Sequence, residues 1–216
     1  MGRELIVETF WLFALIFVCL CLLTWVFNQI FFAPSENVHL RIVNECLSKQ
    51  ALKRGGTMSG NVLVIPHKRT ELTVSYNEGV DEVGPAHIYA THRTELFHDK
   101  KFGIYYWKEL FLRPATLAGS RLELFEEEFG TTYIVSGNDL PFVQSVLTPE
   151  IRGKILELAS AWPRIEFGRP HGSVLSRERG WLTVIFQGSS GVLEADYDRV
   201  IEMAILFYER LEALKR

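Results

Sequence analysis

Three histidines lie close together near the middle of the chain, where a metal site is the first chemistry to consider. His87, His92 and His98 fall within twelve residues, and Asp99 follows directly. A metal site needs three or four ligands that converge on one point. In a strand, however, residues an odd number of positions apart face opposite sides, so His87 and His92 point away from each other. We therefore interpret these histidines as residues of a sheet surface and predict no metal site.

Two loops resemble catalytic or phosphate-binding motifs only in part. Ser189 and Ser190 are flanked by glycines but lack the G-x-S-x-G spacing of a nucleophile elbow. Residues 168–173, GRPHGS, contain glycine and a cation but lack the lysine and the spacing of a P-loop. We interpret both as connecting loops, although the second has the composition for a weak anion grip.

Adjacent carboxylates are the remaining candidates for acid–base chemistry. Glu126, Glu127 and Glu128 are consecutive, but nothing apolar beside them would raise the pKa of one carboxyl group above the others. His67, with Asp81 and Glu82, makes no better constellation. The sequence thus predicts no catalytic residue, no cofactor and no metal, and a protein that is not an enzyme.

The aromatic segment 97–117 is the most informative candidate for contact with other molecules. It contains Tyr105, Tyr106 and Trp107, with Arg113 a few residues further on. Three interpretations stay open: these aromatics belong to the core, they form a protein interface enriched in aromatics and arginine, or they lie against lipid headgroups. We name these four residues as predicted membrane or partner contacts.

An uncharged stretch, Thr9–Ser35, dominates the N-terminal part of the chain. As a helix it would be about 40 Å long, and about 20 apolar residues suffice to cross a bilayer core. Trp11 and Trp25 lie near its ends, where indoles favour the headgroup region. Asn28 and Gln29 either hydrogen-bond a neighbouring transmembrane helix or sit at headgroup level. We therefore predict a single transmembrane helix, with these four residues as further contacts.

The ends of this stretch indicate how it is processed and oriented. The exit reads FFAP, which is bulky where a signal-peptide cleavage site needs small residues. Arg3 precedes the stretch, whereas Arg41, Lys49, Lys53 and Arg54 follow it. Because basic residues stay on the cytoplasmic side, we expect an uncleaved anchor in the bacterial inner (cytoplasmic) membrane, with the large domain in the cytoplasm.

The rest of the chain has the local patterns of an α+β domain. Residues 35–56 have apolar residues at helical spacing and end at two glycines, which predicts a juxtamembrane amphipathic helix that either continues the span or packs on the domain. Strands are predicted at 61–65, 70–76, 87–95, 102–107, 121–125, 131–136, 164–167 and 181–187. Asn138-Asp139 and Thr148-Pro149-Glu150 begin two helices, and a last helix carries an apolar stripe: Tyr197, Val200, Ile201, Ala204, Tyr208 and Leu211. The predicted organisation is a tail and transmembrane helix at 1–34, the helix at 35–56, and one soluble α+β domain at 57–216 with a mainly antiparallel sheet.

The C-terminal third resembles a pattern in uncharacterised bacterial single-span membrane-anchored proteins. The residues that carry the resemblance are YIVSGND at 133–139 and LTPEIR at 147–152, which match V-x-G-x-D followed by L-T-P-E-[VI]-R. The resemblance implies a membrane anchor and a small α+β domain, and it implies no activity. The aromatic segment 97–117 departs from the pattern.

These observations lead to one main hypothesis about function and two alternatives. The main hypothesis is a non-enzymatic, membrane-anchored accessory or scaffold subunit that stabilises a larger multi-subunit membrane complex, for example a respiratory or photosynthetic one. Its expected partners are the lipid bilayer and other transmembrane subunits. The net charge of −3, with both signs interspersed, indicates no nucleic-acid partner. The alternatives are a membrane-tethered ligand-binding or sensory module and a membrane-bound enzyme.

Overall fold

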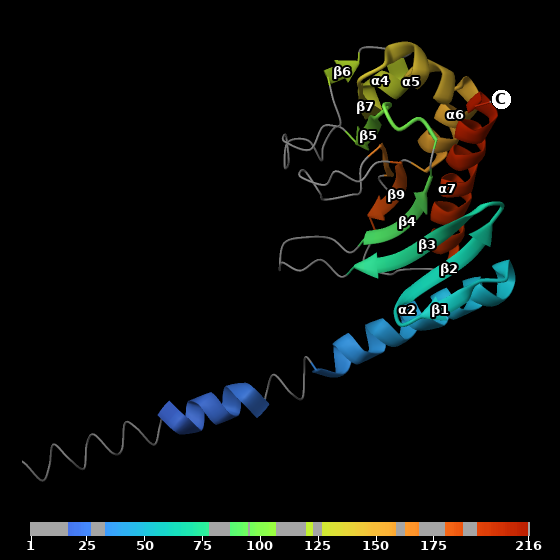
Figure 1. Ribbon diagram of the computed structural model, residues 1–216. Helices are drawn as coiled ribbons and strands as arrows, with labels where there is room; N and C mark the ends of the chain where they lie inside the picture. The colour runs from blue at the N-terminus through green and yellow to red at the C-terminus, as the bar shows by residue number, and fades with distance from the viewer. Residues whose placement is uncertain are drawn as a thin grey trace, which may run out of the picture. The chain divides into compact units, whose positions relative to one another are not determined.

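The computed structural model describes residues 17–26, 33–77, 87–94, 96–106, 120–122, 127–158, 163–168, 180–187 and 194–215. The chain divides into two compact units, Met1–Glu45 and Cys46–Arg216. The second unit contains an antiparallel sheet and the helices that pack against it (Figure 1).

The described strands form one nine-stranded sheet in the order β1-β2-β3-β4-β9-β8-β5-β7-β6. Each neighbouring pair is antiparallel. The strands β1 to β4 form a meander, and β9 returns from the C-terminal third of the chain to pair with β4. The bounds are β1 Thr57–Ser59, β2 Val62–His67, β3 Thr70–Asn77, β4 His87–Arg93, β5 Phe102–Tyr106, β6 Ser120–Leu122, β7 Tyr133–Gly137, β8 Arg164–Phe167 and β9 Trp181–Gln187.

The helices begin where local capping groups satisfy their free N–H groups. They are α2 Ala33–Arg54, α4 Glu127–Thr132, α5 Leu140–Val146, α6 Pro149–Glu157 and α7 Glu194–Lys215. Asp139 caps α5 by accepting a hydrogen bond from the Phe142 backbone N–H at 2.9 Å, and Thr148 caps α6. The sequence prediction of both helix starts is confirmed.

The core lies between the sheet and α7, which contacts β4 and β9 (Figure 1). Alternate strand residues are buried because successive side chains of a strand point to opposite faces. The predicted stripe of α7 is confirmed, since all six of its residues are buried. Burying such a stripe is the main source of stability for a helix in a folded domain.

The predicted transmembrane helix is contradicted by the structure. Residues 17–26 are helical, but a helix of that length rises only about 15 Å, against a bilayer core of about 30 Å. The longer α2 contains Glu36, Arg41 and Glu45 as well as three cations near its end. Among the described residues, no helix is both long and apolar enough to cross a membrane. Residues 9–16 and 27–32 of the predicted span lie outside the described part of the chain.

The predictions that depended on this span are corrected with it. The fold class with a transmembrane helix, the single-pass topology and the placement in the bacterial inner membrane are wrong by this finding. Pro34, expected to break the chain between two helices, instead lies in the first turn of α2, where proline lacks no needed N–H group. The α+β organisation with an antiparallel sheet is what the structure shows for residues 46–216.

The region 120–137 also differs in detail from the predicted hairpin. The strand β6 is three residues long and pairs antiparallel with β7, but the helix α4 precedes β7 directly. Within α4, the hydroxyl groups of Thr131 and Thr132 both donate to the carbonyl oxygen of Glu128, at 3.0 and 2.9 Å. These bonds help residues 128–132 to form a helical turn where a hairpin tip was expected.

Candidate functional site

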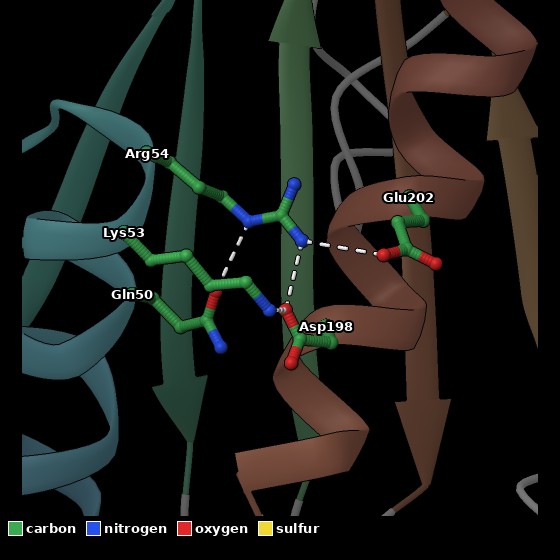
Figure 2. Close-up of polar contacts among 5 residues, drawn as sticks. All are labelled: Gln50, Lys53, Arg54, Asp198 and Glu202. Carbon is green, nitrogen blue, oxygen red and sulfur yellow. Dashed lines mark hydrogen bonds and ion pairs between the residues drawn. The ribbon is translucent and has the colours of Figure 1, made fainter.

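A polar cluster joins the C-terminal end of α2 to the N-terminal half of α7 (Figure 2). The Asp198 Oδ1 atom accepts hydrogen bonds from Lys53 Nζ at 2.7 Å and from Arg54 Nη2 at 2.8 Å. Arg54 also donates from Nε to Gln50 Oε1 at 3.0 Å, and its Nη2 lies 3.5 Å from Glu202 Oε1. Partial burial acts to raise the pKa of Asp198, but the two cations outweigh it and hold that pKa below its ordinary value.

The guanidinium group of Arg54 and the carboxylate of Glu202 also form part of the wall of a groove on the outer side of α7. We call this the α6–α7 groove, and its cavity volume is about 550 Å³. It is lined by Arg54, Lys154, Glu157, Leu158, Arg199, Glu202, Met203, Ile205, Leu206 and Glu209. Apolar side chains thus lie between two helices, among equal numbers of acidic and basic side chains.

The apolar part of this groove is a second patch on α7, separate from the stripe that faces the sheet. At about 100° per residue, Leu206 lies roughly opposite the centre of the buried stripe, and Ile205 lies on the flank. Both side chains are half-buried, as is Leu158 at the end of α6. The groove therefore presents apolar surface on a helix whose other side is already fully packed.

A larger cavity, of about 950 Å³, lies beside the end of α7 and the adjacent strand ends. We call it the Trp181 groove. Its lining residues come from the β2–β3 turn, β3, the end of β4, the start of β9 and α7, and they are Lys68, Arg69, Thr70, Glu71, Thr73, Arg93, Thr94, Leu96, Trp181, Tyr208, Glu212 and Lys215. Four cations against two carboxylates leave this cavity with a positive surplus.

Close backbone packing at the start of β9 sets the position of Trp181. The Thr94 N–H donates to the Gly180 carbonyl oxygen at 2.6 Å. Gly180 has φ +80°, and a Cβ atom there would lie 1.9 Å from the Thr94 carbonyl oxygen, so only glycine fits. The guanidinium carbon of Arg93 then lies 5.9 Å from the Trp181 ring centroid, within cation–π range.

The cations of the Trp181 groove differ in how far their charge is already paired. Lys68 Nζ donates to Glu212 Oε2 at 2.7 Å and lies 3.3 Å from Glu209 Oε1, and the hydrogen bond to Glu212 is the main cause of its raised pKa. Within the described part of the chain, by contrast, Arg69 and Arg93 have no carboxylate partner. These two guanidinium groups are therefore available to an anion from outside the chain.

Two histidines and a tyrosine pack together behind the Trp181 groove. The His92 ring stacks on Tyr208 at 4.7 Å between centroids, and His67 lies 5.6 Å from each of them. His92 is fully buried, and neither ring nitrogen has a hydrogen-bond partner. Burial, with a smaller contribution from His67, lowers the pKa of His92 to about 3, and burial also lowers the pKa of His67. At neutral pH both rings are uncharged, so this cluster is a packing element.

The structure separates the candidate residues that were adjacent in sequence. His92 is buried, whereas His87 is half-buried and His98 is exposed. No group of three metal-binding side chains exists among the described residues. Glu128 is exposed on α4, whereas Ser189, Ser190 and most of 168–173 lie outside the described residues.

The predicted contact residues have different positions. Tyr105 is 2% exposed, in contact with the Arg164 guanidinium group at 5.0 Å, so it belongs to the interior. Tyr106 is half-buried beside Tyr133, and Trp25 is 61% exposed. Trp11, Asn28, Gln29, Trp107 and Arg113 lie outside the described residues, and their contact roles stay predictions.

Sequence reasoning missed both grooves and the histidine–tyrosine cluster. The residues that line each groove come from elements far apart along the chain, so no motif brings them together. One signal was present in the sequence: Ile205 and Leu206 fall off the apolar stripe of the last helix.

Comparison with known proteins gives a distant structural likeness. No protein-family model matches the chain, and no curated protein matches it. Among solved structures, the crystal structure of the mycobacterial trehalose monomycolate transport factor A, TtfA, is similar with a TM-score of 0.45 and 11% sequence identity, over 78% of this chain and 94% of that chain.

Proposed function

We propose that this protein is a non-enzymatic accessory subunit that stabilises a larger multi-subunit complex by holding a partner protein. The partner segment is an amphipathic helix that lies in the α6–α7 groove. The observation that carries the proposal is the second apolar patch of α7, formed by Ile205 and Leu206 on the side away from the sheet, with Leu158 of α6 beside it.

The chemistry of the groove matches that of a site for a helix. An amphipathic helix binds by placing its apolar face in a hydrophobic groove, and burying apolar surface is the main driving force for such contacts. Charged residues at the rim, including Lys154, Arg199 and Glu209, leave both signs available to pair with the polar flanks of the partner helix.

The cluster in Figure 2 supports this role by holding one wall of the groove in place. Arg54 lines the groove, and its guanidinium group is oriented by Gln50, Asp198 and Glu202. A side chain already held by several partners loses less rotamer entropy when a ligand binds. Docking through a membrane span is not part of the proposal, because that span is contradicted for the described residues.

The test is a comparison of two exposed or half-exposed leucines, only one of which lines the groove. Leu206→Asp places a charge in the apolar patch, whereas Leu140→Asp, at a 41% exposed position on α5, is the matched control. Cell extracts prepared in mild detergent are separated by size. We expect the wild-type protein and the Leu140 variant to migrate with a large complex, and the Leu206 variant to migrate near its own mass.

Two results would contradict the proposal. One is wild-type protein that migrates alone under all extraction conditions, and the other is a Leu206 variant that stays in the complex. Circular dichroism melting of the purified variants shows whether each is folded. If Leu206→Asp unfolds the domain, Arg199→Asp at the rim replaces it as the interface variant.

A second candidate function is the ligand-binding or sensory module. The Trp181 groove favours it, because this cavity is larger than the α6–α7 groove and carries two unpaired guanidinium groups. Its walls are charged and aromatic, whereas the sequence hypothesis had assumed an apolar pocket. That the protein is not an enzyme stays a prediction.

A further inference from the structure

The Trp181 groove has the features of a site for a small anion rather than for a second apolar helix. Its lining includes Lys68, Arg69, Arg93 and Lys215, and its apolar surface is limited to Leu96 and the aromatic rings. We propose that this groove binds a phosphate ester, with the phosphoryl group between Arg69 and Arg93 and the organic part against Trp181. This inference is independent of the proposed partner groove on the other side of α7.

The first support is the state of the two arginines. Both side chains are exposed, and neither pairs with a carboxylate among the described residues. A guanidinium group presents several N–H donors in a planar fork that matches phosphate oxygens. Lys215, also exposed and without an ion pair to any described residue, adds a third unpaired charge at the end of α7.

The second support is the sign of the whole cavity. Glu212 is engaged by Lys68 at 2.7 Å, so one of the two lining carboxylates is neutralised within the protein. Glu71 is the other lining carboxylate, and it is exposed at the rim. A surplus of positive charge inside a concave surface concentrates the field and attracts anions.

The third support is Trp181 itself. Its Nε1 atom is closed off from solvent and has no hydrogen-bond partner, although a buried indole N–H usually finds an acceptor. The Thr73, Thr94 and Thr70 hydroxyl groups line the same cavity. An oxygen-rich ligand thus supplies acceptors next to donors that the chain leaves open, and the indole face offers a planar surface for its organic part.

The ligand chemistry has two possible sources, a soluble phosphate monoester or the headgroup of a phospholipid. Phenyl phosphate is the soluble probe, and its binding is measured by calorimetry and by the change in tryptophan fluorescence. Vesicles of phosphatidylcholine containing phosphatidylglycerol, compared with pure phosphatidylcholine, are the headgroup probe, and their binding is measured by flotation. The full chain is used in both experiments.

The variants are Arg93→Gln and Arg69→Gln, with Arg199→Gln as the control that removes the same charge from the α6–α7 groove. Removing one charged partner of a phosphate contact weakens binding by about tenfold. We therefore expect saturable binding that falls about tenfold in each groove variant, stays within about twofold in the control, and weakens as salt is added.

Each outcome decides the matter. Arginine-dependent binding of phenyl phosphate supports the proposal with a soluble ligand, and arginine-dependent binding of the anionic vesicles alone supports it with a lipid headgroup. No binding to either probe, or an equal loss in the Arg199 control, overturns it. Because both groove arginines are exposed, unchanged melting curves are expected and show that the loss is local. None of these results depends on Leu206 or the partner complex.

Discussion

The fully buried, unpaired His92 makes a sharp prediction about acid stability. Its pKa is about 3 in the folded protein against an ordinary value of 6.5. The unfolded chain therefore binds a proton that the folded protein excludes, and stability is lost as the pH falls from 6.5 towards 3. The change to test is His92→Phe, which keeps a ring of similar shape against Tyr208 but removes the titrating group.

The size of the effect follows from the two pKa values. Linkage between protonation and folding gives a loss of about 0.2 kcal/mol from this residue at pH 7 and about 2 kcal/mol at pH 5. The pKa of His67 is also lowered by burial, so it contributes in the same direction. At pH 7 the Phe variant should be at least as stable as the wild type, because neither His92 nitrogen has a hydrogen bond to lose.

Urea unfolding followed by circular dichroism at pH 7, 6 and 5 measures this effect. The free energy of unfolding of the wild type should fall more steeply with acidification than that of the His92→Phe protein, and the difference should reach about 2 kcal/mol at pH 5. The control is His98→Gln, an exposed position, which should follow the wild-type curve. Parallel curves for wild type and His92→Phe would refute the reasoning, because they would mean that His92 is protonated equally in both states.

Three further predictions concern the groups that position the two grooves. Asp198→Asn should lower the free energy of unfolding by about 2 kcal/mol at pH 7, because hydrogen bonds to charged partners are lost; since the pKa of Asp198 is lowered on folding, its contribution is present above its ordinary 3.8 and is lost as the pH falls through the folded value, so the gap between the two urea curves should close in acid. Gly180→Ala should cost about 2 kcal/mol or more through its positive φ and the contact with Thr94, seen as a lower melting temperature. Asp139→Ala removes the cap of α5 and should cost about 1 kcal/mol in urea unfolding; an unchanged midpoint would show that the cap is dispensable.

Much of the secondary structure was predictable because its signals act over a few residues. The strands at 164–167 and 181–187 and the starts of α5 and α6 follow from local alternation and from caps such as Asp139 and Thr148. The transmembrane prediction failed for the described part of the chain. An uncharged run predicts a span only if the whole run forms one helix, and residues 17–26 are the described helical part.

The aromatic segment shows why composition alone did not separate core from surface. Tyr105 is buried because Gly103 leaves room for its ring: a Cβ atom at Gly103 would lie 2.3 Å from the tyrosine hydroxyl oxygen. Arg164, brought alongside by the pairing of β5 with β8, lies against the other part of the ring. Neither contact is visible from the order of residues, since one depends on backbone geometry and the other on strand pairing.

The sequence by itself determined where most strands begin, how two helices are capped and which stripe of the last helix is buried, because these features depend on neighbours within one or two turns. Only the tertiary structure decided that His67 and His92 meet under Tyr208, that Arg69 and Arg93 share a cavity with Trp181, and that Leu206 lies in a groove with Leu158. The physical reason is that strand order and helix packing bring together elements that are distant along the chain, and both grooves exist only where such elements meet.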